Sequence, residues 1–270
     1  MSDDEKLLTP AEQEQLRKHY STGHGARRWA RRLFGVAPSD PRCKLCHAPF
    51  GGIGGKLFGL TPYSPSRKNP RFCKICFERS PAGGVEVSIG VLFADIRGYT
   101  ALAESKPPHE VASLLNRFYA VATDALCDRD AVIDKLMGDE VMALFLPGMT
   151  GPGCFDKMAS AAESLLRGVG YGSSEGPWVP LGVGMDFGLA YVGNVGAGEV
   201  KDFTAIGDTV NTAARLQGEA KSGQIVLSER VYREVGERYP DAPRVELQLK
   251  GKSEPVPAHI VEIAPTITTA

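Results

Sequence analysis

From residue 85 onward, the pattern of apolar and polar positions predicts a regular domain of strands and helices. Residues 85–96, VEVSIGVLFADI, place apolar side chains at every second position, which is the period of a strand. A helix is predicted next, because apolar residues recur three and four positions apart. Its apolar face comprises Val111, Leu114, Leu115, Phe118, Ala122 and Leu126. Two short apolar runs, AVIDKLM and EVMALFL, are then separated by Gly138-Asp139, a dipeptide typical of a two-residue hairpin.

The rest of the pattern adds a second helix and further strands. FDKMASAAESLLRGV predicts a helix, and VPLGVGMDFGLAYVGNVG predicts two strands bent at Gly188. Another helix is expected after Gly207, with Asp208 as its N-cap. RVELQLKGKSEPVPAHIVEI predicts a closing pair of strands. Strand, helix, two strands, helix and strand is the order of a ferredoxin-like βαββαβ layer, so we expect an α/β (α+β) fold with extra strands.

The first 80 residues lack this regularity, and we expect two smaller segments there. Residues 1–38 are predicted to be helical, with Pro10 near a helix start. ARRWARRLFG at 26–35 would either pack on the protein or a second subunit, or bind an anionic surface or partner. Residues 39–80 are rich in Gly, Pro, Lys and Cys, so a metal is expected to supply the stability that their small core cannot. SPAGG at 80–84 predicts a linker to the large domain at 85–264.

Four of the six cysteines form two C-x2-C pairs separated by 26 residues. These are Cys43, Cys46, Cys73 and Cys76. In a chain without an export signal, this spacing favours metal binding over disulfides. Four thiolates suit a structural Zn2+ site, with an iron–sulfur centre or redox-active thiols as alternatives. His47 is interpreted as a polar neighbour, and the isolated Cys127 and Cys154 as small core residues.

Composition and charge are those of an ordinary globular protein. The 270 residues are 43% hydrophobic and 23% charged, with a net charge of −1. This balance gives no support to nucleic acid or anionic membrane as a partner of the whole protein. No apolar run approaches the length of a spanning helix, and the start, MSDDEKLL, lacks the features of a signal peptide. The expected location is therefore the cytoplasm.

Two carboxylates stand where apolar strands end. Asp95 continues the alternating row of the first strand, where an isolated buried charge would be too costly unless paired or bound to a cation. Asp139 lies at the predicted hairpin tip. Carboxylates on neighbouring strand ends suit Mg2+ or Mn2+ bound together with substrate phosphates, although each alone could equally be a turn or capping residue. The backbone N–H groups of Gly98, Tyr99 and Thr100 precede a helical stretch and could face phosphate oxygens.

Four motifs in order give the chain a close resemblance to the class III nucleotidyl cyclase catalytic domain, the family of adenylyl and guanylyl cyclases. They are FADIRGYT, DKLMGDEVMALF, DFTAIGDTVNTAARL and LKGKSEPV, within about residues 85–264. The resemblance implies two divalent cations, Mg2+ or Mn2+, held by Asp95, Asp139 and the carbonyl of Ile96. It also implies attack of a ribose 3′-hydroxyl on the α-phosphate, giving a 3′,5′-cyclic nucleotide and pyrophosphate.

The resemblance further assigns phosphate and base recognition. Asn211 and Arg215, four residues apart on one helix face, match residues that orient the ribose and stabilise charge on the α-phosphate. Lys250 matches the lysine that neutralises the terminal phosphates. Lys135 and Thr204 match the base-reading pair. Because a lysine only donates hydrogen bonds, it suits adenine N1 and opposes guanine N1–H, so ATP is favoured.

One departure concerns Gly182, where some relatives carry an arginine that reaches the phosphates. In this family one chain supplies the metal aspartates and the other supplies the remaining groups, so a two-fold homodimer is expected to build two sites. The regulatory partner stays open. The alternatives are a guanylyl cyclase, a diguanylate cyclase, since GDE resembles part of a GGDEF hairpin, and a catalytically silent nucleotide-binding or scaffold protein.

Overall fold

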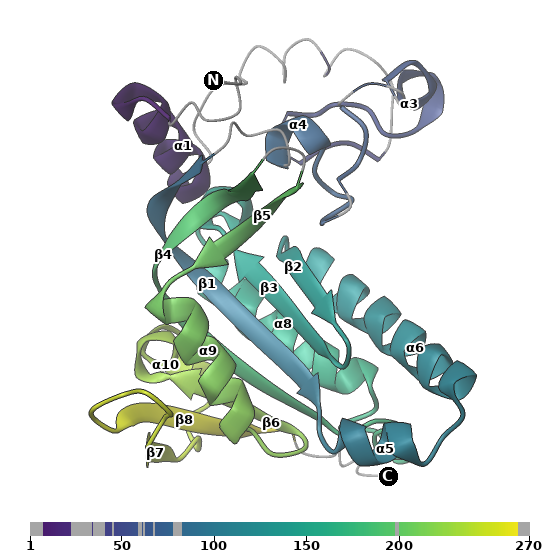
Figure 1. Ribbon diagram of the computed structural model, residues 1–270, viewed down its shortest axis with the longest axis vertical. Coiled ribbons are helices and arrows are strands. Elements are labelled where there is room, and N and C mark those ends of the chain that lie inside the picture. The colour runs from purple at the N-terminus through teal and green to yellow at the C-terminus, as the bar shows by residue number, and fades with distance from the viewer. Residues whose placement is uncertain are drawn as a thin grey trace.

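A single eight-stranded sheet organises the computed structural model (Figure 1). The structure describes residues 8–22, 34, 41–44, 46–58, 61, 63–66, 68–77, 83–197 and 200–263. The strands are β1 Gly83–Ile96, β2 Val132–Met137, β3 Glu140–Phe145, β4 Leu181–Ala197, β5 Val200–Ile206, β6 Gln224–Ser228, β7 Arg244–Leu247 and β8 Val256–Glu262. Their order is β2-β3-β1-β4-β6-β8-β7, and β5 pairs with the far half of β4.

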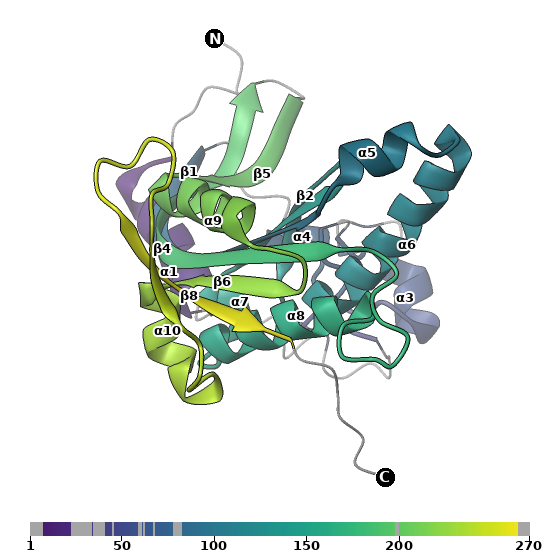
Figure 2. The same ribbon diagram turned by 90° about the horizontal axis from the view of Figure 1, so that it is seen from below.

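Helices cover both faces of this sheet, as Figure 2 shows for α8 and α9. The helices are α1 Pro10–Thr22, α3 Gly52–Phe58, α4 Lys74–Phe77, α5 Tyr99–Glu104, α6 Pro108–Cys127, α7 Pro147–Thr150, α8 Cys154–Gly168, α9 Asp208–Glu219 and α10 Glu229–Val235, with the 3-10 turn η2 Gly236–Arg238. The α/β (α+β) class expected from the sequence is confirmed, and β1, α6, β2, β3, α8 and β4 follow in the predicted order, with the short helices α5 and α7 in addition.

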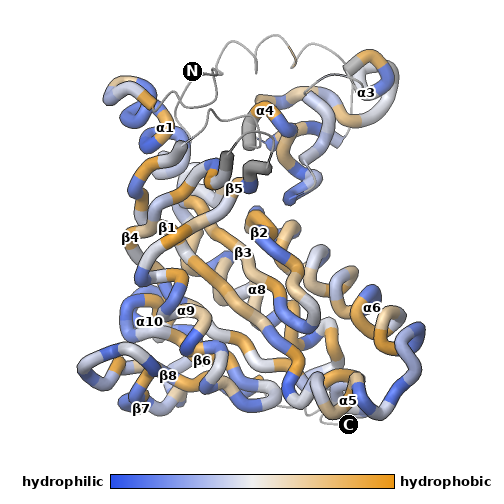
Figure 3. The backbone as a smooth tube through the Cα atoms, in the orientation of Figure 1, coloured by the Kyte–Doolittle hydropathy of each residue, from blue (hydrophilic) through white to orange (hydrophobic). Residues whose placement is uncertain are grey.

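The first half of β1 alternates because one face is buried and the other exposes Glu86 and Ser88, whereas its second half is buried on both faces. Leu92, Ala94 and Ile96 join the core formed with α6 and α8, whereas Val91 and Phe93 join a second core on the opposite face. Figure 3 shows the resulting concentration of hydrophobic residues along the central strands. Cys127 and Cys154 are buried in the first core, as predicted, and burial raises the pKa of Cys127 to about 12.

Two details of the predicted elements are wrong. The stretch around Gly188 is one continuous strand, β4, because β1 pairs with it from Leu181 to Asn194, across Gly188, and β5 pairs with its last residues, Tyr191 to Ala197. Gly188 leaves room for neighbouring side chains instead of forming a bend, since a Cβ there would lie 2.3 Å from Nη1 of Arg230 and 2.7 Å from Oγ1 of Thr209. Asp208 is the first residue of α9 and makes no cap; Gly207 precedes the helix, and the Asp208 carboxylate binds Lys252.

The N-terminal helix begins at Pro10, as expected, and lies along the start of β1. Arg17 Nε donates to the carbonyl of Glu86 at 3.2 Å, and the buried ring of Tyr20 meets Phe203 edge-on at 5.8 Å. The predicted basic helix at 26–35 lies outside the described residues, apart from Phe34. Of the predicted linker, Gly83 and Gly84 belong to β1, and the rest is likewise outside the described residues. Among the described helices, none is long and apolar enough to span a membrane.

Candidate functional site

The two predicted metal aspartates lie side by side. Pairing of β1 with β3 places Asp95 opposite Glu140, and the N–H of Ile96 donates to the carbonyl of Asp139 at 3.2 Å. Burial, followed by a side-chain hydrogen bond with Asp95, raises the pKa of Asp139 to about 6. Two carboxyl groups this close repel each other when both are ionised, which a bound divalent cation would relieve. The donor set therefore fits Mg2+ or Mn2+.

Arg97 is a cation of this cluster that the sequence analysis did not single out. Its Nη2 lies 2.7 Å from Oδ2 of Asp95, and its backbone N–H donates to the carbonyl of Pro180 at 2.9 Å. A Cβ at Gly182 would lie 3.2 Å from Nε of Arg97. The guanidinium of Arg97 thus adjoins the position at which some relatives carry a phosphate-binding arginine. Its place directly after Asp95-Ile96 was the signal available in the sequence.

The predicted phosphate-binding turn follows β1 directly. Gly98 adopts a left-handed conformation with φ of 70°, and α5 begins at Tyr99, with Thr100 as its second residue. A side chain at Gly98 would meet nothing within 4 Å, so the glycine serves the backbone conformation of the turn.

A second group of predicted residues gathers on α9 and the turn between β7 and β8. Asn211 and Arg215 lie on α9, and Lys250 is exposed in the turn. A Cβ at Gly251 would lie 3.3 Å from Nη2 of Arg215, so this turn contacts the arginine. Lys252, which the sequence analysis did not assign, donates to both Asp208 carboxylate oxygens at 2.7 and 2.6 Å. This contact holds the turn against α9.

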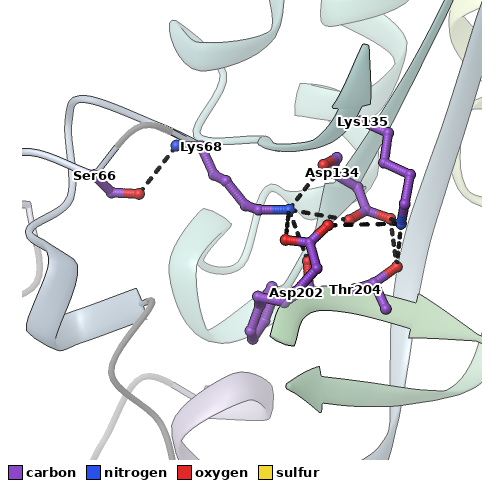
Figure 4. Close-up of polar contacts among 7 residues, drawn as sticks. Ser66, Lys68, Asp134, Lys135, Asp202 and Thr204 are labelled. Carbon is purple, nitrogen blue, oxygen red and sulfur yellow. Dashed lines mark hydrogen bonds and ion pairs between the residues drawn. The ribbon is translucent and has the colours of Figure 1, made fainter. Parts of the chain in front are cut away.

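The predicted base-reading residues are in direct contact (Figure 4). Lys135 Nζ donates to Oγ1 of Thr204 at 2.9 Å, and that hydroxyl donates to Oδ2 of Asp134 at 2.7 Å. Lys135 Nζ also lies 3.3 Å from the same Asp134 oxygen. A break in register between Ile133 and Lys135 explains the arrangement, because a β-bulge can turn two consecutive side chains to one side. Asp134 was missed, although it directly precedes Lys135.

The cysteine segment brings three predicted ligands together. The Sγ atoms of Cys43, Cys46 and Cys73 lie within 4.8 Å of one another, and all three residues are fully buried. The Cys46 and Cys73 sulfurs are 3.5 Å apart, close to the roughly 3.8 Å between thiolates around a tetrahedral Zn2+. Cys76 lies in α4, and its side chain is outside the described structure. The three described ligands fit a metal of the predicted kind.

Solved structures with the same fold are nucleotidyl cyclases. The guanylyl cyclase Cya2 is 23% identical, with a TM-score of 0.62, covering 69% of this chain and 98% of that one. The adenylyl cyclase CyaB from P. aeruginosa is 25% identical, with a TM-score of 0.56, covering 66% and 95%. The first of these likenesses concerns the fold alone. Together they include both base specificities.

The curated relatives include mycobacterial proteins. The uncharacterized protein Rv1318c of Mycobacterium tuberculosis is 37% identical over 153 residues, or 56% of this chain and 28% of the relative. The uncharacterized protein Rv1320c of the same organism is 38% identical over 146 residues, or 54% and 25%. The chain thus matches about a quarter of the length of these relatives.

The family model of the Adenylate and Guanylate cyclase catalytic domain matches residues 85–262, about two thirds of the chain. This range contains both aspartates, the base-reading pair, the α9 residues and Lys250. The chain belongs to the family of adenylate and guanylate cyclase catalytic domains.

Proposed function

We propose that the protein is an adenylate cyclase, which converts ATP to 3′,5′-cyclic AMP and pyrophosphate for intracellular signalling. The observation that carries the reaction is the position of Asp95 beside Asp139 at adjoining strand ends. These carboxylates and the carbonyl of Ile96 would hold Mg2+ or Mn2+ ions. When bound, the cations would neutralise phosphate charge and lower the pKa of the ribose 3′-hydroxyl.

The protein's own groups then orient the nucleotide. Arg215 presents a planar, permanently charged fork suited to the oxygens of the α-phosphate, and Asn211 lies one turn before it on the same face of α9. Lys250, in the neighbouring turn, supplies positive charge for the terminal phosphates. Gly98, Tyr99 and Thr100 offer backbone N–H groups at the start of α5. Arg97 adds a cation beside Asp95, which compensates for Gly182.

Recognition of adenine is supported by hydrogen-bond polarity. Lys135 Nζ can donate to adenine N1, whereas guanine presents a donor at that position. Thr204 can accept from the adenine 6-amino group. Its contact with Lys135 at 2.9 Å supports their action as a pair. Guanylate cyclase activity is the second candidate, because solved structures with this fold include guanylyl cyclases.

The catalytic unit is proposed to be a homodimer. One chain would contribute Asp95 and Asp139, and its partner would contribute Lys135, Thr204, Asn211, Arg215 and Lys250. Because each chain carries both sets, a two-fold dimer would contain two equivalent sites.

The cysteine segment is proposed to hold one structural Zn2+ through Cys43, Cys46, Cys73 and Cys76. Close approach of three buried sulfurs supports this proposal. An iron–sulfur centre would use the same residues and would be distinguished by a coloured protein with visible absorption.

Product identification tests the activity. Purified protein is incubated with ATP or GTP and Mn2+, and products are identified by chromatography and mass spectrometry, with Asp139→Asn as the inactive control. Cyclic AMP and pyrophosphate from ATP are expected. Cyclic GMP alone would contradict the choice of base. Nucleotide binding without any product would support the silent binding module instead.

A further inference from the structure

Lys68 reaches the base-reading pair from outside the cyclase domain. It lies in the cysteine segment, before the residues that match the family. The described residues 64–66 and 68–74 form a hairpin-like loop, in which Ser66 N–H donates to the carbonyl of Phe72 at 2.8 Å. A bridge between Pro65 and Cys73 closes the loop. Cys73, a predicted metal ligand, therefore stands at the base of the loop that carries Lys68.

The Lys68 ammonium group joins β2 to β5 (Figure 4). Its Nζ donates to the carbonyl of Asp134 and to the carbonyl of Phe203, both at 2.8 Å. It also lies 3.3 Å from Oδ1 of Asp134 and 2.8 Å from Oδ1 of Asp202. Only 17% of the side chain is exposed, so the charge is well shielded from water.

The backbone around Lys68 is fixed to the edge strand of the sheet. Its carbonyl accepts from the N–H of Ile133 at 2.9 Å. The next residue, Asn69, is fully buried and donates through Nδ2 to the carbonyl of Ala131 at 2.6 Å. These contacts hold the loop in register with β2, so the position of the ammonium group is determined by the fold.

Both lysines lie near Asp134 and Asp202; the Asp134 side chain has no exposed surface, whereas that of Asp202 is half exposed. The Oδ1 atom of Asp134 faces Lys68, whereas its Oδ2 accepts from Thr204 and faces Lys135. A buried carboxylate requires compensating charge. With Lys68 in place, Lys135 need not supply all of it. Without Lys68, Lys135 would be the remaining ammonium group at this carboxylate and would be drawn toward it.

We propose that Lys68 is a positioning residue for base recognition: by sharing the negative charge of Asp134 and Asp202, it weakens the hold of Asp134 on Lys135 and Thr204, so that both can turn from this carboxylate to the base. Nucleotide selectivity is then set in part by the cysteine segment. This inference rests on the proposed function, since it concerns the same base-reading pair.

The test compares Lys68→Met with Lys68→Arg and with Arg71→Met in the full-length protein. Arg71 lies in the same loop and pairs with Asp128, away from the base-reading residues, so it is the matched control. Measurements are kcat and KM for ATP and GTP with Mn2+, and Kd for the non-cyclising α,β-methylene analogues of both nucleotides.

Loss of charge in Lys68→Met is expected to lower the ATP-over-GTP ratio of kcat/KM about tenfold, or about 1.4 kcal/mol. Most of the change should appear in KM and in Kd. Lys68→Arg should recover most of the ratio, and Arg71→Met should keep it. If Lys68→Met does not fold, Lys68→Gln takes its place in the same measurements. Its amide is uncharged but can still donate a hydrogen bond to the Phe203 carbonyl.

An unchanged ratio in the folded, uncharged variant would overturn the role of Lys68, as would an equal loss in Arg71→Met. A wild-type protein that binds the ATP analogue but makes no cyclic nucleotide would overturn the proposed activity instead. In that case the ratio of Kd values for the ATP and GTP analogues, compared between wild type and the variants, would still test the role of Lys68. A wild-type protein that binds neither analogue would overturn both proposals.

Discussion

Replacing Asp139 by Asn should stabilise the metal-free protein while removing its response to divalent cations. The pKa of Asp139 is raised from 3.8 to about 6 by burial and by Asp95. Between about pH 4 and pH 6 the folded protein therefore binds more protons at this residue than the unfolded chain does. Raising the pH through this window lowers the free energy of unfolding, and the loss persists above pH 6.

The magnitude follows from the shift and from solvent access. About two pKa units correspond to roughly 3 kcal/mol if the whole effect is retained. Asp139 lies in a half-exposed turn, where water and salt screen the charges, so about 1 kcal/mol is a better expectation. In Asp139→Asn the neutral amide can still hydrogen-bond to Asp95, and Asp95 keeps its ion pair with Arg97. The variant should gain this 1 kcal/mol at pH 7.5.

Urea unfolding with EDTA at pH 4.5 and pH 7.5 measures the gain, with Asp124→Asn on the exposed surface of α6 as the control. The difference between Asp139→Asn and wild type should fall to about a third of its pH 7.5 value at pH 4.5, because only that part of the window between the two pKa values has been crossed. With Mg2+ or Mn2+ at tenfold excess over Kd, the wild type should gain about 1.4 kcal/mol and the variant little. A variant less stable than wild type at pH 7.5, or a difference independent of pH, would refute the reasoning.

Three further predictions concern the dimer, the cysteine cluster and the packing of α9. Mixing an Asp95→Ala chain with an Arg215→Ala chain should restore about a quarter of wild-type activity, since half of the dimers regain one complete site; proven heterodimers without activity would contradict shared sites. Cys73→Ser should lose the zinc that elemental analysis finds in the wild type, and a colourless wild-type protein without zinc would contradict the Zn2+ assignment. Gly184→Ala should cost about 3 kcal/mol in urea unfolding, because its Cβ would lie 2.1 Å from the Gln217 backbone nitrogen, whereas Gly218→Ala meets nothing within 4 Å and should be neutral or slightly stabilising.

The sequence predicted those parts of the fold that local patterns determine. The period of β1, the apolar face of α6 and the Gly138-Asp139 corner each depend on neighbouring residues, and each is confirmed. The bend at Gly188 was wrong because a glycine in a strand can serve either a bend or a close approach. Thr209 and Arg230, the side chains for which this glycine leaves room, are distant in the sequence.

In the candidate site too, local sequence motifs identify individual residues, whereas contacts between distant segments do not follow from the sequence. Family motifs identified Asp95, Asp139, Lys135 and Thr204 one by one, and the fold brings the two aspartates to adjoining strand ends, where the N–H of Ile96 donates to the carbonyl of Asp139. The motifs do not indicate which residues balance their charges.

Charge balance at the base-reading pair depends on contacts between distant segments. Asp134 is buried because a β-bulge turns it inward, and such a carboxylate is costly unless cations reach it. Lys135 alone would satisfy it, but only at the expense of its availability to a base. Lys68 resolves this conflict from a loop 66 residues earlier in the chain. If the cysteine cluster fixes that loop through Cys73, then loss of its metal should shift nucleotide selectivity in the same direction as Lys68→Met.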